Sequence, residues 1–135
     1  MCEKAERLIQ RYYTAFNAGD MPALLALLTE DVIHDINQGV REIGRDAFTL
    51  FLARMNRSYD EQLVDLEIML SRDGRRAAAE FTVVGQYLIS DEGLPLASGQ
   101  RYRLPAGAFF ELRENHISRV TNYYNLWDWV FQVGG

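Results

Sequence analysis

One acidic side chain near the end of a short apolar segment raises the question of chemistry in this chain. Asp35 lies in VIHDINQG, residues 32–39, and shares one face of an extended segment with Ile33. Removal of a proton next to a carbonyl needs a base within hydrogen-bond reach, in a site that keeps water out. A short carboxylate on a strand that faces a cavity meets this need. The alternative is that Asp35 begins a turn before NQG, a common role for aspartate.

A hydroxyl donor for the same cavity could come from two adjacent tyrosines. Tyr12 and Tyr13 lie in one predicted helix, where neighbouring side chains project about 100° apart. A buried tyrosine hydroxyl needs a hydrogen-bond partner, so one of the two is expected to point into the cavity. The alternative is that both tyrosines only pack in the core.

The two histidines do not indicate a metal site. His34 is adjacent to Asp35 and faces the opposite side of the strand, so we expect it at the surface or in an interface. His116, in ENHIS, is expected in a solvated turn. Neither has carboxylates at the spacing of a metal site, and the chain has no glycine-rich phosphate-binding loop. We therefore predict neither a metal nor a cofactor.

Three helical segments should position these residues. Apolar residues spaced three and four apart form one stripe over residues 3–18. That helix should end at Gly19, and the next should begin at Asp20 with Pro22 in its first turn. A short strand, DVIHDI, follows, and a third helix is predicted near residues 45–57.

Four long strands are predicted after these helices: EQLVDLEIMLS, RRAAAEFTVVGQYLIS, SGQRYRLPAGAFFELR and HISRVTNYYNLWDWVFQV, the last ending in an aromatic-rich tail. Tight turns at RDG, DEGLP and EN predict antiparallel pairing. Pro105 and Gly107 predict a bulge in the third strand, because proline cannot donate to a sheet ladder. Helices followed by strands predict an α+β domain, with helices against one face of a curved sheet.

Composition excludes several classes of protein. The 135 residues suit one domain, residues 1–135, which is large enough to fold without disulfides. A single cysteine fits a reducing compartment, so a cytoplasmic protein is expected. No apolar run is long enough for a membrane span, and a formal net charge of −5 argues against nucleic-acid binding.

The order of these segments resembles the nuclear transport factor 2-like superfamily. RYYTAFNAGDMPALLALLTEDVIHDINQG, followed by GRDAF, is similar in spacing to ketosteroid isomerases and SnoaL-like polyketide cyclases. GQRYRLPAGAFFELRENHISRVTNYYNLWDWVFQV resembles a ketosteroid isomerase-related subgroup. The resemblance covers nearly the whole chain. It implies a cone-shaped α+β barrel, with three N-terminal helices packed on a strongly bent, mostly antiparallel sheet, and a homodimer formed through the open sheet face.

Three isomerase positions can be carried over onto this sequence. The resemblance implies that Asp35 is the general base and that Tyr12, directly after an arginine, is the oxyanion-hole tyrosine. The protonated acid that completes the oxyanion hole in the isomerases is replaced by Ala108. One of the two donors to the enolate oxygen is therefore missing.

The other candidates are expected to hold a hydrophobic small molecule in a cavity that the helices cover. Asn122 and Tyr124 share a strand face, and Asn122 could donate to a substrate carbonyl. The remaining candidates for substrate binding are Phe110, Phe51 and Phe16. On the second long strand, either the face of Glu80 or the face of Phe81 could point inward.

Three functions stay open at this point. The first is an isomerase or cyclase that acts on a hydrophobic carbonyl compound without a cofactor. The second, favoured by Ala108, is a non-catalytic small-molecule binding protein. The third is a protein-interaction module on the same fold.

Overall fold

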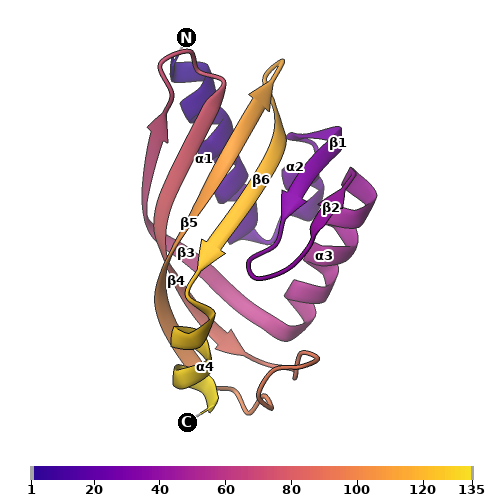
Figure 1. The fold of residues 1–135 in the computed structure, drawn as a ribbon, viewed down its shortest axis with the longest axis vertical. Helices are drawn as coiled ribbons and strands as arrows, with labels where there is room; N and C mark the ends of the chain where they lie inside the picture. The colour runs from indigo at the N-terminus through magenta and orange to yellow at the C-terminus, as the bar shows by residue number, and fades with distance from the viewer. Residues whose placement is uncertain (1, 135) are drawn as a thin grey trace.

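The computed structural model, which describes residues 2–134, has one six-stranded sheet with helices packed on it (Figure 1). The helices are α1 (Cys2–Ala18), α2 (Met21–Leu25), α3 (Arg45–Ser58) and α4 (Leu126–Gly134), and the strands are β1 (Leu28–Asp35), β2 (Arg41–Ile43), β3 (Tyr59–Leu70), β4 (Arg76–Tyr87), β5 (Arg101–Arg113) and β6 (His116–Tyr124). The strand order is β2-β1-β6-β5-β4-β3. All neighbours pair antiparallel except β1 and β6, which are parallel. The predicted α+β class is confirmed.

Local signals at the first helix break act as expected. Gly19 adopts a φ of 68°, in the left-handed region that glycine tolerates, and ends α1. The Asp20 carboxylate accepts a hydrogen bond from the backbone N–H of Ala23 at 3.2 Å and so caps α2. Pro22 lies in the first turn, where no N–H is needed.

The bulge predicted at Pro105 and Gly107 is absent. Pro105 and Gly107 pair in regular register with β4, so no bulge lies there. Pro105 lies beyond the last residue pair of β5 with β6, where its missing N–H interrupts no ladder. The register shifts lie elsewhere: in β3 between Val64 and Glu67, where Asp65 has a φ of 56°, in β5 between Glu111 and Leu112, and in β1 between Leu28 and Ile33.

The C-terminal aromatic segment is a helix, where a strand and tail were predicted. The Asn125 side chain accepts a hydrogen bond from the backbone N–H of Asp128 at 3.2 Å and caps the start of α4. Figure 1 shows α4 at the same end of the sheet as the loop that follows β4. Trp129 packs there against Tyr87, with ring centroids 5.0 Å apart. The helix therefore closes one end of the sheet.

The core lies between the helices and the inner face of the sheet. On β4 the alternation is regular, with Ala79, Phe81 and Val83 buried and Glu80 exposed on the outer face, which settles the face of that strand. No helix within residues 2–134 is long and apolar enough to cross a membrane.

Candidate functional site

A cavity of about 660 Å³ lies between the inner face of the sheet and helices α1, α3 and α4. This volume falls within the range of small-molecule sites, about 300–1,000 Å³. Most of its wall is aromatic or aliphatic. The polar side chains that contribute to it include Tyr12, Tyr13, His34, Glu61, Tyr102 and Asn122. A few polar groups in a mostly apolar wall are typical of sites that orient a hydrophobic ligand.

His34, expected at the surface, is instead a buried part of the cavity wall. Its side chain is only 2% exposed, stacks on Phe48 with ring centroids 4.4 Å apart, and meets the edge of Phe51 at 4.5 Å. The prediction was wrong because adjacent residues of a strand face opposite sides, and Val32, on the same face as His34, is fully buried. The face of Val32 and His34 is the inner one.

Burial sets the charge of this imidazole. Desolvation lowers the pKa of His34 from 6.5 to about 4, and the nearby Asp35 carboxylate opposes this shift only partly. His34 is therefore neutral at pH 7. Its Nε2 lies 3.5 Å from the Asn122 amide nitrogen, and its Nδ1 is buried with no hydrogen-bond partner within residues 2–134. A neutral imidazole with one free nitrogen can give or accept a proton in an apolar cavity.

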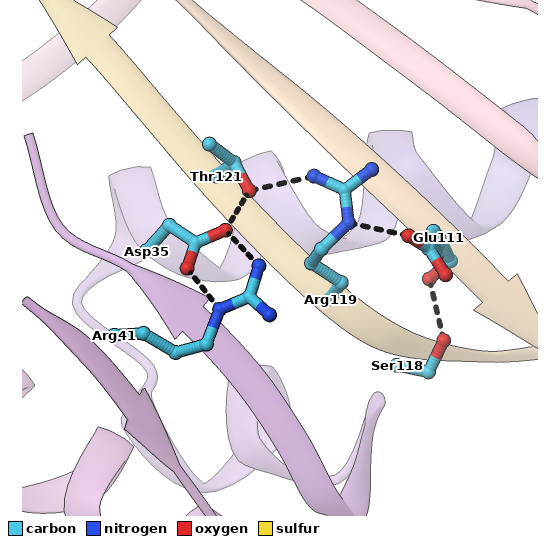
Figure 2. A network of polar contacts seen from close by, with 6 residues as sticks. All are labelled: Asp35, Arg41, Glu111, Ser118, Arg119 and Thr121. Carbon is cyan, nitrogen blue, oxygen red and sulfur yellow. Dashed lines mark hydrogen bonds and ion pairs between the residues drawn. The ribbon is translucent and has the colours of Figure 1, made fainter.

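Asp35, expected to point into the cavity, faces the other side of the sheet. Figure 2 shows its carboxylate in front of the strands, paired with Arg41 at 2.7 Å and accepting a hydrogen bond from the Thr121 hydroxyl at 2.6 Å. The network continues through Arg119, which contacts Thr121 and Glu111. The Arg41 guanidinium, more than any other group, holds the pKa of Asp35 below its usual value. The carboxylate thus joins β1, β2 and β6 on the outer face.

Both tyrosines of α1 contribute to the cavity wall. Tyr12 packs edge-on against Phe110, with centroids 5.5 Å apart, and burial raises the pKa of its hydroxyl above the usual 10. The hydroxyl of Tyr13 is buried with no partner in the described part of the chain. The structure thus brings both Tyr12 and Tyr13 to the cavity, where the sequence left open which one would reach it.

The candidates for substrate binding divide between the cavity wall and the core behind it. Phe16, Phe51, Asn122 and Tyr124 contribute to the cavity wall. Phe110 is fully buried behind the tyrosines and is absent from the wall. Ala108 is paired with Asn122 across β5 and β6, is 1% exposed, and places no acid beside the amide.

One acidic residue of the cavity wall was missed by the sequence analysis. Glu61, on β3, accepts a hydrogen bond from the Tyr102 hydroxyl at 2.6 Å. Burial raises the pKa of Glu61 above its usual value, although the Tyr102 hydrogen bond opposes this. The available signal was its place on the strand face of Tyr59 and Leu63, where a charged residue between two apolar ones is unusual.

The cavity carries no group that suggests a metal. Within residues 2–134, no three histidine, cysteine, aspartate or glutamate side chains lie close enough to hold an ion together. Asp91, also in the wall, accepts a hydrogen bond from the Tyr59 hydroxyl at 2.9 Å.

Comparison with known proteins identifies close relatives of this chain. The SnoaL-like domain family matches residues 9–120. Three crystal structures, each described as a putative polyketide cyclase, are similar over nearly the full length. The structure from Pseudomonas putida KT2440 is 64% identical, with 96% of this chain and 97% of that chain covered and a TM-score of 0.94. The structure from Xanthomonas campestris pv. campestris is 57% identical, with 96% of each chain covered and a TM-score of 0.93. The structure from Silicibacter sp. TM1040 is 50% identical, with 98% of this chain and 97% of that chain covered and a TM-score of 0.96. A search of the curated proteins gave no match.

Proposed function

The chain belongs to the SnoaL-like domain family, and we propose that its cavity is the active site of a cofactor-independent isomerase or cyclase that acts on a hydrophobic carbonyl compound. The observation that carries this proposal is His34: a neutral, buried imidazole in the cavity wall whose Nδ1 has no hydrogen-bond partner within residues 2–134. A general base must be unprotonated at the working pH and within hydrogen-bond reach of the proton that it removes.

His34 would act as the base in place of Asp35. When the Asn122 side-chain carbonyl accepts a hydrogen bond from Nε2–H, the Nδ1 lone pair is free to take a proton from the carbon next to the substrate carbonyl. The electrons of the broken C–H bond then form an enolate, and Nδ1–H returns the proton to another carbon. The structure places the Asn122 amide nitrogen 3.5 Å from Nε2, so this arrangement requires the amide to be turned over, which exchanges its nitrogen and oxygen.

The enolate oxygen would be stabilised by hydroxyls of α1. The buried hydroxyl of Tyr13 has no partner within the described residues, so a ligand oxygen that reached it would supply the missing acceptor. Tyr12 lies beside it, with ring centroids 5.1 Å apart. Tyr12 and Tyr13 would then be the two donors to the enolate oxygen, with Tyr13 in place of the acid for which Ala108 is substituted.

Exchange of carbon-bound hydrogen tests this proposal without knowledge of the natural substrate. A panel of apolar ketones, beginning with 2-acetylnaphthalene, is incubated with the protein in D₂O, and loss of the α-proton signal is followed by ¹H NMR. The wild type should accelerate exchange, and His34→Gln should slow it by about 10²–10⁴-fold, the usual contribution of a general base. Asp35→Asn is the matched control, since its carboxylate faces away from the cavity, and it should exchange like the wild type.

A non-catalytic binding protein is the second candidate, and Ala108 favours it. Loss of one oxyanion-hole donor typically slows an enzyme by about 10²–10³-fold. If ketones raise the melting temperature of the protein and no member of the panel exchanges faster, the cavity binds without catalysis. Exchange that depends on Asp35 and not on His34 would refute the assignment of the base.

We also propose that the protein is a homodimer through the outer face of the sheet. Phe109 and Tyr123 lie side by side on that face, with centroids 5.8 Å apart, and are 48% and 58% exposed. Exposed aromatic pairs of this kind are common at the centre of protein interfaces. On α4, Trp127 and Phe131 are also exposed, at 70% and 78%, and these favour a further protein contact as the third candidate role.

A further inference from the structure

Three residues on three neighbouring strands form a lateral row in the cavity region. The strand register places Glu61 of β3 opposite Gly85 of β4, and Gly85 opposite Tyr102 of β5. Strands lie about 4.8 Å apart, so Glu61 and Tyr102 are separated by roughly 10 Å of backbone. Their side chains nevertheless meet, with the hydroxyl of Tyr102 donating to Glu61 Oε2 at 2.6 Å. Tyr102 therefore reaches across the middle strand.

Gly85 makes this crossing possible. A Cβ at position 85 would lie 2.4 Å from the Tyr102 Cζ and 2.5 Å from its hydroxyl oxygen, closer than real Cβ contacts. Glycine within a strand weakens the strand, and its usual explanation is the close approach of another group. Here that group is the Tyr102 ring. Because position 85 has no side chain, the Tyr102 hydroxyl can reach the Glu61 carboxylate across β4.

The hydrogen bonds of this pair leave one acceptor free. Tyr102 has one O–H proton and donates it to Glu61 Oε2. Glu61 Oε1 has no hydrogen bond, and no lysine or arginine within residues 2–134 forms an ion pair with the carboxylate. Both side chains lie in the cavity wall beside Tyr59 and Trp129. Glu61 is half-buried, and a carboxylate oxygen that faces the cavity without a protein partner is suited to accept a hydrogen bond from a ligand.

We infer that Glu61 and Tyr102 form a second polar site of the cavity and that this site binds a hydroxyl group, alcohol or phenol, of the ligand. The free Oε1 would accept from the ligand O–H. The inference rests on the proposed function only in sharing its cavity. A hydrophobic molecule with a hydroxyl at one end is therefore the expected class of substrate.

The position of this site defines the shape of the ligand. Asn122, beside His34, is opposite Ala108 on β5, the strand that also carries Tyr102. At about 3.3 Å per residue, the levels of Ala108 and Tyr102 are roughly 20 Å apart along the strand, and less across the bent sheet. The carbonyl at His34 and the hydroxyl at Glu61 would thus be at opposite ends of one elongated ligand. A ligand of this site would therefore carry a polar group at each end, and not at one end only.

Calorimetric titration with matched probes tests the hydroxyl site separately from catalysis. The first pair of probes is 2-naphthol and its methyl ether, 2-methoxynaphthalene. The second pair is the alcohol 1,2,3,4-tetrahydro-2-naphthol and its methyl ether. None of the four compounds carries a carbonyl. A hydrogen bond to a carboxylate contributes about 10- to 100-fold in affinity, so the wild type should prefer the naphthol by that factor. In Glu61→Gln the preference should disappear, because an amide N–H serves the ether oxygen as well as the hydroxyl.

Two further variants separate the site from general effects on folding. Gly85→Ala removes no polar group but displaces Tyr102, so the preference for naphthol should fall as it does in Glu61→Gln. Glu80→Gln makes the same chemical change on the outer face and should keep the wild-type preference. His34→Gln should also keep it while losing ketone exchange, which separates this inference from the proposed base. The inference is overturned if the wild type and Glu61→Gln prefer the hydroxyl compounds over the methyl ethers by the same factor. It is also overturned if the wild type binds neither hydroxyl compound.

Discussion

The pH dependence of stability gives the most direct physical test of the assignment of His34. In the unfolded chain this imidazole titrates near 6.5, and in the folded chain its pKa falls to about 4 because of burial. Below pH 6.5 the unfolded state takes up a proton that the folded state does not, so the folded state loses stability as pH falls. Above pH 6.5 both states are neutral and His34 adds no pH dependence.

The magnitude follows from the difference between the two values. From pH 6.5 to pH 5 the loss is 1.36 kcal/mol for each pH unit, about 2 kcal/mol in total. His34→Gln cannot titrate, so this loss should be absent from its pH profile. The difference in free energy of unfolding between the wild type and His34→Gln should therefore shrink by about 2 kcal/mol between pH 7 and pH 5. The other titrating groups are the same in both proteins and cancel in this comparison.

Urea unfolding followed by circular dichroism at pH 7, 6 and 5 measures this difference. His116→Gln is the matched control, because it makes the same replacement at an exposed residue, the first of β6, outside the cavity wall. A constant difference between the wild type and His34→Gln over this pH range would refute the reasoning. It would mean that the imidazole is solvated or charged in the folded chain and is not the neutral base of a dry cavity.

Three further predictions follow from the same structure. Glu61→Gln should gain stability relative to the wild type as pH rises from 4 to 8. The pKa of Glu61 is higher in the folded chain than in the unfolded chain, so ionisation of Glu61 destabilises the folded wild type above the unfolded-state pKa. Melting temperatures of both proteins across this pH range measure the effect, and parallel curves would contradict it. Phe48→Ala should cost about 3–5 kcal/mol in urea unfolding, because the ring is 1% exposed and stacks on His34; a loss below about 1 kcal/mol would show a loosely packed wall. Phe109→Asp should convert the proposed homodimer into a monomer in sedimentation velocity, and Glu80→Gln should not; a monomeric wild type would reject the dimer.

Much of the fold follows from short-range signals in the sequence. The apolar stripe of α1, the break at Gly19 and Asp20, and the turn at Glu114 and Asn115 each act within a few residues, so the sequence alone indicates them. The last helix was missed because its many aromatic residues suit a strand as well as a helix. Its cap, Asn125 three residues before Asp128, was the signal that could have identified it.

The site was harder to predict because it depends on which face of a strand is buried. Alternation showed that His34 and Asp35 face opposite sides, but it did not show which side is covered. Only the contacts of His34 with Phe48 and Phe51 on α3, and of Asp35 with Arg41, decide this. The pair of Glu61 and Tyr102 lies further from any local pattern, since it needs three strands in register.

The central claim is that the cavity is a ligand site whose reacting end is His34. The most direct measurement is a long-range ¹H–¹⁵N NMR spectrum of the histidine rings at pH 7, recorded with and without 2-acetylnaphthalene. We expect a neutral His34 whose Nδ1 resonance moves when the ketone is added, while the ring resonances of His116 stay in place. A ketone that binds without moving either ring nitrogen of His34, or a His34 that is charged at pH 7, would contradict the account.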